Sequence, residues 1–82
     1  MNLSDLRTEI ESVDDELVDL LARRAHLVRA IWAHKAAQGL PQHDPDREAA
    51  EIGRLLAQAD ARGLSRERIA TVLATVIGHD LW

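Results

Sequence analysis

The chain has 82 residues, of which 46% are hydrophobic and 29% charged, so it is long enough for one small globular domain and too short for two. It contains no cysteine, which excludes a disulfide framework, a thiolate metal site and a thiol nucleophile. The net charge of −4, the lack of Phe and Tyr and the lack of a long apolar run argue against nucleic-acid and membrane partners. We therefore expect a single cytoplasmic domain over residues 1–82, with no signal peptide at its start.

A first segment without Gly or Pro runs from about Ser4 to Gln38 and predicts one long helix. We expect Ser4 to cap its N-terminus, Asp5 to suit the positive end of the helix dipole, and Gly39 to end it. Its apolar residues repeat in sevens, which is typical of a coiled-coil seam. One row of this seam is Leu6, Val13, Leu20 and Leu27, and the other is Ile10, Leu17 and Ile31.

Two shorter helices are expected after Pro41. The first opens at Asp44 as N-cap, with Pro45 in the first helical position, and ends at Gly63, whereas Ser65 caps the second. Their apolar stripes are Ile52, Leu55, Leu56 and Ala59, and then Ile69, Val72, Leu73, Val76, Ile77 and Leu81. Since no segment alternates like a strand, the predicted fold class is all-α, with one long and two shorter helices.

The length of the first helix predicts a dimer. About 34 helical residues span roughly 50 Å, whereas a compact monomer of this size is only about 30 Å across. The helix would overhang such a monomer and expose its seam to water. We therefore expect an intertwined homodimer, and a monomer is the weaker alternative.

Two cations share the apolar face of the first helix. Arg24 takes a seam position, and Lys35 follows eleven residues later, only about 20° further round an ideal helix, with no acid between them. An isolated seam arginine is explained by snorkelling or by a pair with Asp19 or Glu16. Two cations together predict an anion, either a protein carboxylate or a ligand, because unpaired buried charge is costly.

Arg7 occupies the same heptad position as Lys35 but lies about 25 Å from Arg24 along the helix axis. Within one chain these two arginines cannot share a small-molecule site, whereas across a dimer they can. At the start of the second predicted helix, the helix dipole explains the presence of Asp44 and Asp46.

Arg47 opposes that dipole, which favours a pair with Asp44 or with a substrate carboxylate. Glu48 begins the inward stripe, although a solvated surface charge is an equal alternative for both residues. The histidines at positions 26, 34, 43 and 79 show no metal-ligand spacing, and we interpret them as surface or rim residues.

Taken together, these spacings resemble the all-helical chorismate mutases over nearly the whole chain. No single motif is specific, and the resemblance lies in the joint spacing. The matching residues are Leu6-Arg7, Ile10, Asp14 or Asp15, Leu17, Leu20-Leu21, Arg24, Lys35, Gly39-Leu40-Pro41 and Asp44-Pro45-Asp46-Arg47-Glu48.

The resemblance implies rearrangement of chorismate, a small dicarboxylate, to prephenate in a site that needs no metal or cofactor and is shared between two subunits. By this resemblance, Arg24 binds a substrate carboxylate together with Arg7 of the partner subunit. Lys35 donates to the ether oxygen, a role that suits a compact ammonium. Glu48 accepts from the ring hydroxyl with help from the backbone near Asp44, and Arg47 closes the entrance.

The C-terminus departs from the family pattern. The family's Ser position falls on Asp80, and its Gln position falls beyond Trp82, so an acid is expected near a substrate carboxylate unless Asp80 points away or pairs with Arg24. Three alternatives follow. The chain is a slow mutase, it is activated by another shikimate-pathway enzyme, or it acts on a relative of chorismate as a 4-amino-4-deoxychorismate mutase or an isochorismate pyruvate lyase. A non-catalytic helical dimerisation module is the alternative outside enzymes.

Overall fold

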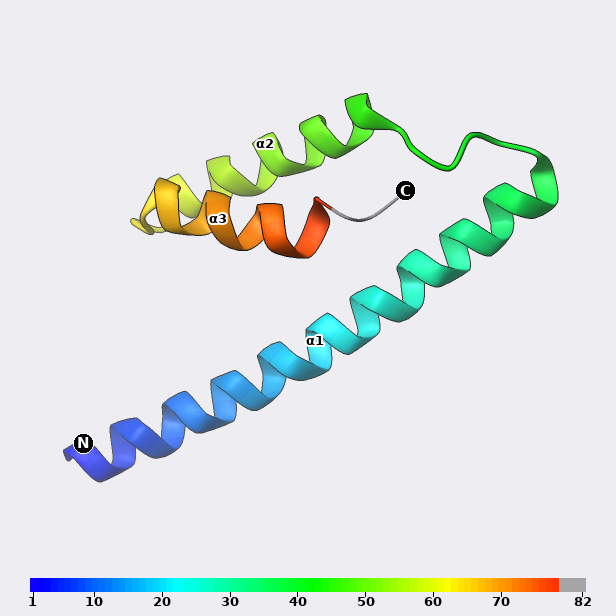
Figure 1. Cartoon of the computed structure of the whole chain (residues 1–82). Coiled ribbons are helices and arrows are strands. Elements are labelled where there is room, and N and C mark those ends of the chain that lie inside the picture. Colours follow the sequence, from blue (N-terminus) through cyan, green and yellow to red (C-terminus); the bar gives the residue numbers. More distant parts are fainter. Residues whose placement is uncertain (79–82) are drawn as a thin grey trace. The chain divides into compact units, whose positions relative to one another are not determined.

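A computed structural model of the chain describes residues 1–78 and contains three helices in that part. They are α1 (Leu3–Gln38), α2 (Pro45–Ala61) and α3 (Arg66–Ile77), as Figure 1 shows. The predicted all-α class and the order of one long and two shorter helices are confirmed. The chain divides into two compact units, Met1–Ala30 and Ile31–Trp82.

The start of α1 differs from the prediction, because Asn2 and not Ser4 is the cap. The backbone N–H of Asp5 donates to Asn2 Oδ1 at 2.8 Å, and the Asn2 N–H lies 3.4 Å from Asp5 Oδ2. This reciprocal pair is a capping box, which needs a cap residue three positions before the acid. Ser4 is too close to Asp5 for that geometry and lies inside the first turn, where its carbonyl accepts from the Thr8 hydroxyl at 3.1 Å.

The unit Met1–Ala30 consists of helical turns of α1 preceded by its cap. A lone helix cannot bury its own apolar face, so the rows of the seam are not covered by other residues of this unit. The six seam residues of this unit are between 46% and 62% exposed, namely Leu6, Ile10, Val13, Leu17, Leu20 and Leu27. An apolar row of this length is typical of a surface that packs against another helix.

Both α1 and α2 are terminated by a glycine, as predicted. Gly39 has a φ of +66° and follows Gln38, while the Leu40 N–H donates to the Lys35 carbonyl at 2.9 Å. Gly63 has a φ of +71° and repeats this arrangement after α2. These are Schellman motifs, in which glycine adopts the left-handed conformation without a Cβ penalty.

In the unit Ile31–Trp82, α2 and α3 pack against each other (Figure 1). Asp44 caps α2 by accepting from the Arg47 N–H at 3.1 Å, and Ser65 caps α3 by accepting from the Arg68 N–H at 3.3 Å. Both caps were predicted. In these two helices Ala59 and Ile77 are buried, and the apolar residues Ile52, Leu55, Leu56, Ile69, Leu73 and Val76 are half-buried.

Val72 does not belong to that packed face, contrary to the prediction. Its side chain is 53% exposed, whereas Ile77 is 1% exposed. On an ideal helix the two residues point about 140° apart, which places Val72 at the edge of the stripe. Leu81 lies outside the described residues.

No helix within residues 1–78 combines the length and apolarity that a membrane crossing requires.

Candidate active site

Lys35 lies in the last turn of α1, within the unit Ile31–Trp82, and is half-buried. Because the helix ends at Gln38 and Gly39 turns the chain, the following segment passes back by the lysine side chain. Lys35 Nζ donates a hydrogen bond to the Gln42 carbonyl at 3.2 Å. The turn after α1 therefore holds the ammonium at the start of the connection to α2.

Lys35 and Asp44 line a common hollow of about 410 Å³, which we call the Lys35 hollow. This volume lies within the roughly 300–1,000 Å³ of small-molecule sites. The other described residues of its lining are Leu40, Pro41, His43 and Pro45. The structure thus brings together Lys35 and Asp44, two of the predicted site residues. The same hollow is lined by His43, which was predicted only as a surface or rim residue.

Glu48 lines a second hollow of about 350 Å³, the Glu48 hollow, together with His43, Pro45, Ala49, Ile52 and Gly78. Its side chain is 21% exposed, and its Oε2 lies 4.0 Å from His43 Nδ1. The predicted inward orientation of Glu48 is supported by this burial. Since His43 and Pro45 line both hollows, the Lys35 hollow and the Glu48 hollow adjoin each other.

The N-terminus of α2 carries a concentration of polar groups. Asp44 uses Oδ1 to cap the helix and its carbonyl to accept from the Glu48 N–H at 3.1 Å. Asp46 and Glu48 lie in the first turn, where negative charge interacts favourably with the helix dipole. This arrangement holds the backbone beside Asp44 in a fixed geometry, next to both hollows.

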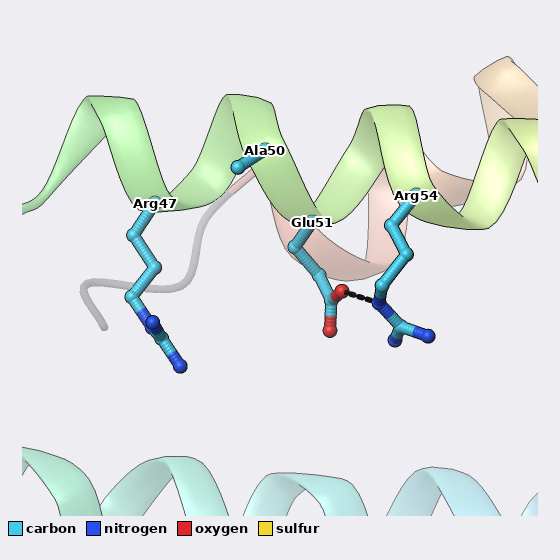
Figure 2. Close-up of a pocket in the computed structure, with 4 residues that line it drawn as sticks. All are labelled: Arg47, Ala50, Glu51 and Arg54. Carbon is cyan, nitrogen blue, oxygen red and sulfur yellow. Dashed lines mark hydrogen bonds and ion pairs between the residues drawn. The ribbon is translucent and has the colours of Figure 1, made fainter.

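Arg47 lies elsewhere, in a third hollow of about 360 Å³ lined by Arg47, Ala50, Glu51 and Arg54 (Figure 2). Glu51 pairs with Arg54, and this hydrogen bond and the Glu51 charge raise the pKa of Arg54. Arg47 precedes Glu48 by one residue, which turns its side chain about 100° round the helix. The structure therefore places Arg47 in a different hollow from Lys35 and Glu48.

Arg7 and Arg24 belong to the unit Met1–Ala30, whereas Lys35 belongs to the unit Ile31–Trp82. Arg7 is exposed and Arg24 is half-buried. Seventeen residues of helix separate them by about 25 Å, so one chain cannot place both on the same small ligand. Asp80 lies outside the described residues.

The described residues form a small all-helical protein in which a lysine and a carboxylate lie beside adjoining hollows. The chain matches the family chorismate mutase type II over residues 6–79 and belongs to that family.

Three curated relatives are similar to the chain. The T-protein of Haemophilus influenzae is 41% identical over 71 residues, or 87% of this chain and 19% of the relative. The T-protein of Enterobacter agglomerans is 40% identical over 75 residues, or 92% and 20%. The bifunctional chorismate mutase/prephenate dehydratase of Aquifex aeolicus is 44% identical over 46 residues, or 56% and 13%.

The chain thus spans about a fifth or less of the length of these relatives. No solved structure matches it significantly.

Proposed function

We propose that residues 1–82 form a single chorismate mutase domain, which acts in the cytoplasm as a homodimer and rearranges chorismate to prephenate. The observation that carries this proposal is the placement of half-buried Lys35 and Glu48 on adjoining hollows at the start of α2. Membership of the chorismate mutase type II family supports it. The Aquifex aeolicus relative, a bifunctional chorismate mutase/prephenate dehydratase, points by its name to the same reaction.

The rearrangement needs positioning and electrostatic stabilisation and no nucleophile. The ether C–O bond of chorismate breaks while a new C–C bond forms, so all atoms stay in one molecule. A protein accelerates such a step by holding the compact reactive conformer and by placing donors where charge develops. In this proposal Lys35 donates to the ether oxygen, and an ammonium has three N–H donors, of which the Gln42 carbonyl accepts one.

The remaining roles follow the polarity of the substrate. The Glu48 carboxylate accepts from the ring hydroxyl, with the backbone beside Asp44 as a further contact. Arg24 and Arg7 of the partner subunit bind a carboxylate. Arg47 lines a separate hollow of α2, and its closing of the entrance stays a prediction. Asp80 stays a predicted contact near the substrate.

A homodimer is supported by the exposed seam of α1 and by the separation of the two arginines. The seam offers an apolar surface to a second helix, and the partner's copy of Arg7 avoids the distance that separates Arg7 from Arg24 in one chain. We propose two identical sites for each dimer.

The test is the loss of chorismate absorbance with the purified chain, with the product identified by chromatography. Parallel assays use isochorismate and 4-amino-4-deoxychorismate, and a last assay adds another shikimate-pathway enzyme. Prephenate from chorismate supports the proposal. Turnover of one analogue alone shifts the function to the corresponding lyase or amino-substrate mutase, and no turnover in any assay contradicts catalysis and leaves a helical dimerisation module.

A further inference from the structure

His43 lies where the two hollows adjoin, and its sequence context predicted only a surface or rim residue. It precedes the cap residue Asp44, lines both the Lys35 hollow and the Glu48 hollow, and its side chain is 50% exposed. Its Nδ1 lies 4.0 Å from Glu48 Oε2, an ion-pair distance when the ring is protonated. The ring is therefore next to the carboxylate that the proposed function assigns to the substrate hydroxyl.

The charges round His43 are few and of known sign. Among the described residues that line the two hollows, Lys35, Asp44 and Glu48 carry charge, and Asp46 and Arg47 follow in the first turn of α2. A histidine changes charge between about pH 5 and 8, a range in which carboxylates, lysine and arginine normally keep theirs.

We infer that His43 is a positioning residue that holds one oxygen of the Glu48 carboxylate and leaves the other oxygen for the hydroxyl of the substrate. A carboxylate has two acceptor oxygens, so one can bind the ring while the other binds a ligand. The attraction strengthens when His43 is protonated, and the added positive charge also attracts a dicarboxylate substrate. The inference rests on the proposed function for the identity of the substrate, and its contact with Glu48 stands on the geometry alone.

The kinetic test compares the parent with His43→Gln, which keeps an N–H donor but cannot become charged. The parent's kcat/KM for chorismate is expected to rise about two- to five-fold from pH 8 to pH 6, a change that corresponds to the free energy of an exposed ion pair. The kcat/KM of His43→Gln is expected to stay constant over this range. The control is His34→Gln, which removes an exposed histidine of α1 that does not line either hollow. This variant should keep the parental pH profile.

In a Glu48→Gln background, His43→Gln should change the pH profile by less than about two-fold, because the two effects share one contact.

A second measurement does not depend on turnover. In NMR spectra at pH 6, Glu48→Gln should shift the ring signals of His43 and leave those of His34 in place. Unchanged His43 signals overturn the inference, and so does a His43→Gln pH profile equal to that of the parent. If the parent leaves chorismate unchanged, the proposed function fails, whereas the ring signals still decide whether His43 contacts Glu48.

Discussion

Lys35 is the side chain on which the proposed chemistry depends most. It lies in the last turn of α1, donates to the Gln42 carbonyl at 3.2 Å and lines a hollow of about 410 Å³. Its ammonium is a compact point charge, whereas arginine is a planar fork with a different reach. Lysine at this position therefore suits a single developing charge better than it suits a carboxylate.

We expect Lys35→Ala to lower kcat/KM for chorismate by about 100- to 1000-fold, the usual effect of losing one aimed donor. Lys35→Arg should recover only a small part of this loss, because its donors lie further out. Steady-state kinetics measure the effect, and circular dichroism checks that the helices remain. Arg29→Ala, at an exposed position of the same helix, is the control for removal of a cation. Near-parental rates for Lys35→Ala would rule out this assignment.

At the scale of the helices, the ends were predictable wherever one local signal decided them. Asp44, Ser65, Gly39 and Gly63 have the positions that sequence rules give them, since caps and left-handed glycines act within one turn. The start of α1 was predicted wrongly because two cap residues compete, and only the reciprocal bond with Asp5 selects Asn2 over Ser4.

Gly39 and Gly53 provide a matched pair of glycine substitutions. Gly39 has a φ of +66°, so Gly39→Ala places a Cβ in the left-handed region and is expected to lower the free energy of unfolding by about 1–2 kcal/mol. Gly53 lies inside α2 with open space round its missing Cβ, so Gly53→Ala should raise the free energy of unfolding by up to about 1 kcal/mol. Urea unfolding followed by circular dichroism measures both. Equal effects of the two substitutions would contradict the assigned turn.

For the whole molecule, the sequence predicted the proximity of those candidate site residues that belong to one unit. Lys35, Asp44 and Glu48 lie round adjoining hollows because a short turn and one helix start connect them. His43 was missed because it belongs to neither an apolar period nor a family motif. The placement of Arg47 in another hollow depends on the rotation of α2, which spacing alone did not resolve. The joint role of Arg7 and Arg24 stays a prediction, because it rests on the proposed pairing of two copies of the chain.

The exposed seam predicts the oligomeric state. Leu17 is 53% exposed in the single chain, and Leu17→Glu would place a charge within the proposed interface between two copies. We expect the parent to sediment as a dimer and Leu17→Glu to lose most of the dimer at micromolar concentration, because burial of an unpaired charge is costly. Thr8→Glu adds the same charge on the opposite face of α1 and should remain dimeric. A monomeric parent would contradict the proposed assembly.

The measurement that tests the shared site most directly mixes two variants that are each inactive alone, Arg7→Ala and Lys35→Ala. In a two-fold dimer, each mixed dimer contains one site with both parental residues and one site with neither. With equal amounts and complete chain exchange, about one quarter of all sites are intact, so about one quarter of the parental activity toward chorismate should return. No recovery, with exchange proven by mass spectrometry of differently tagged chains, would contradict a site built from two subunits.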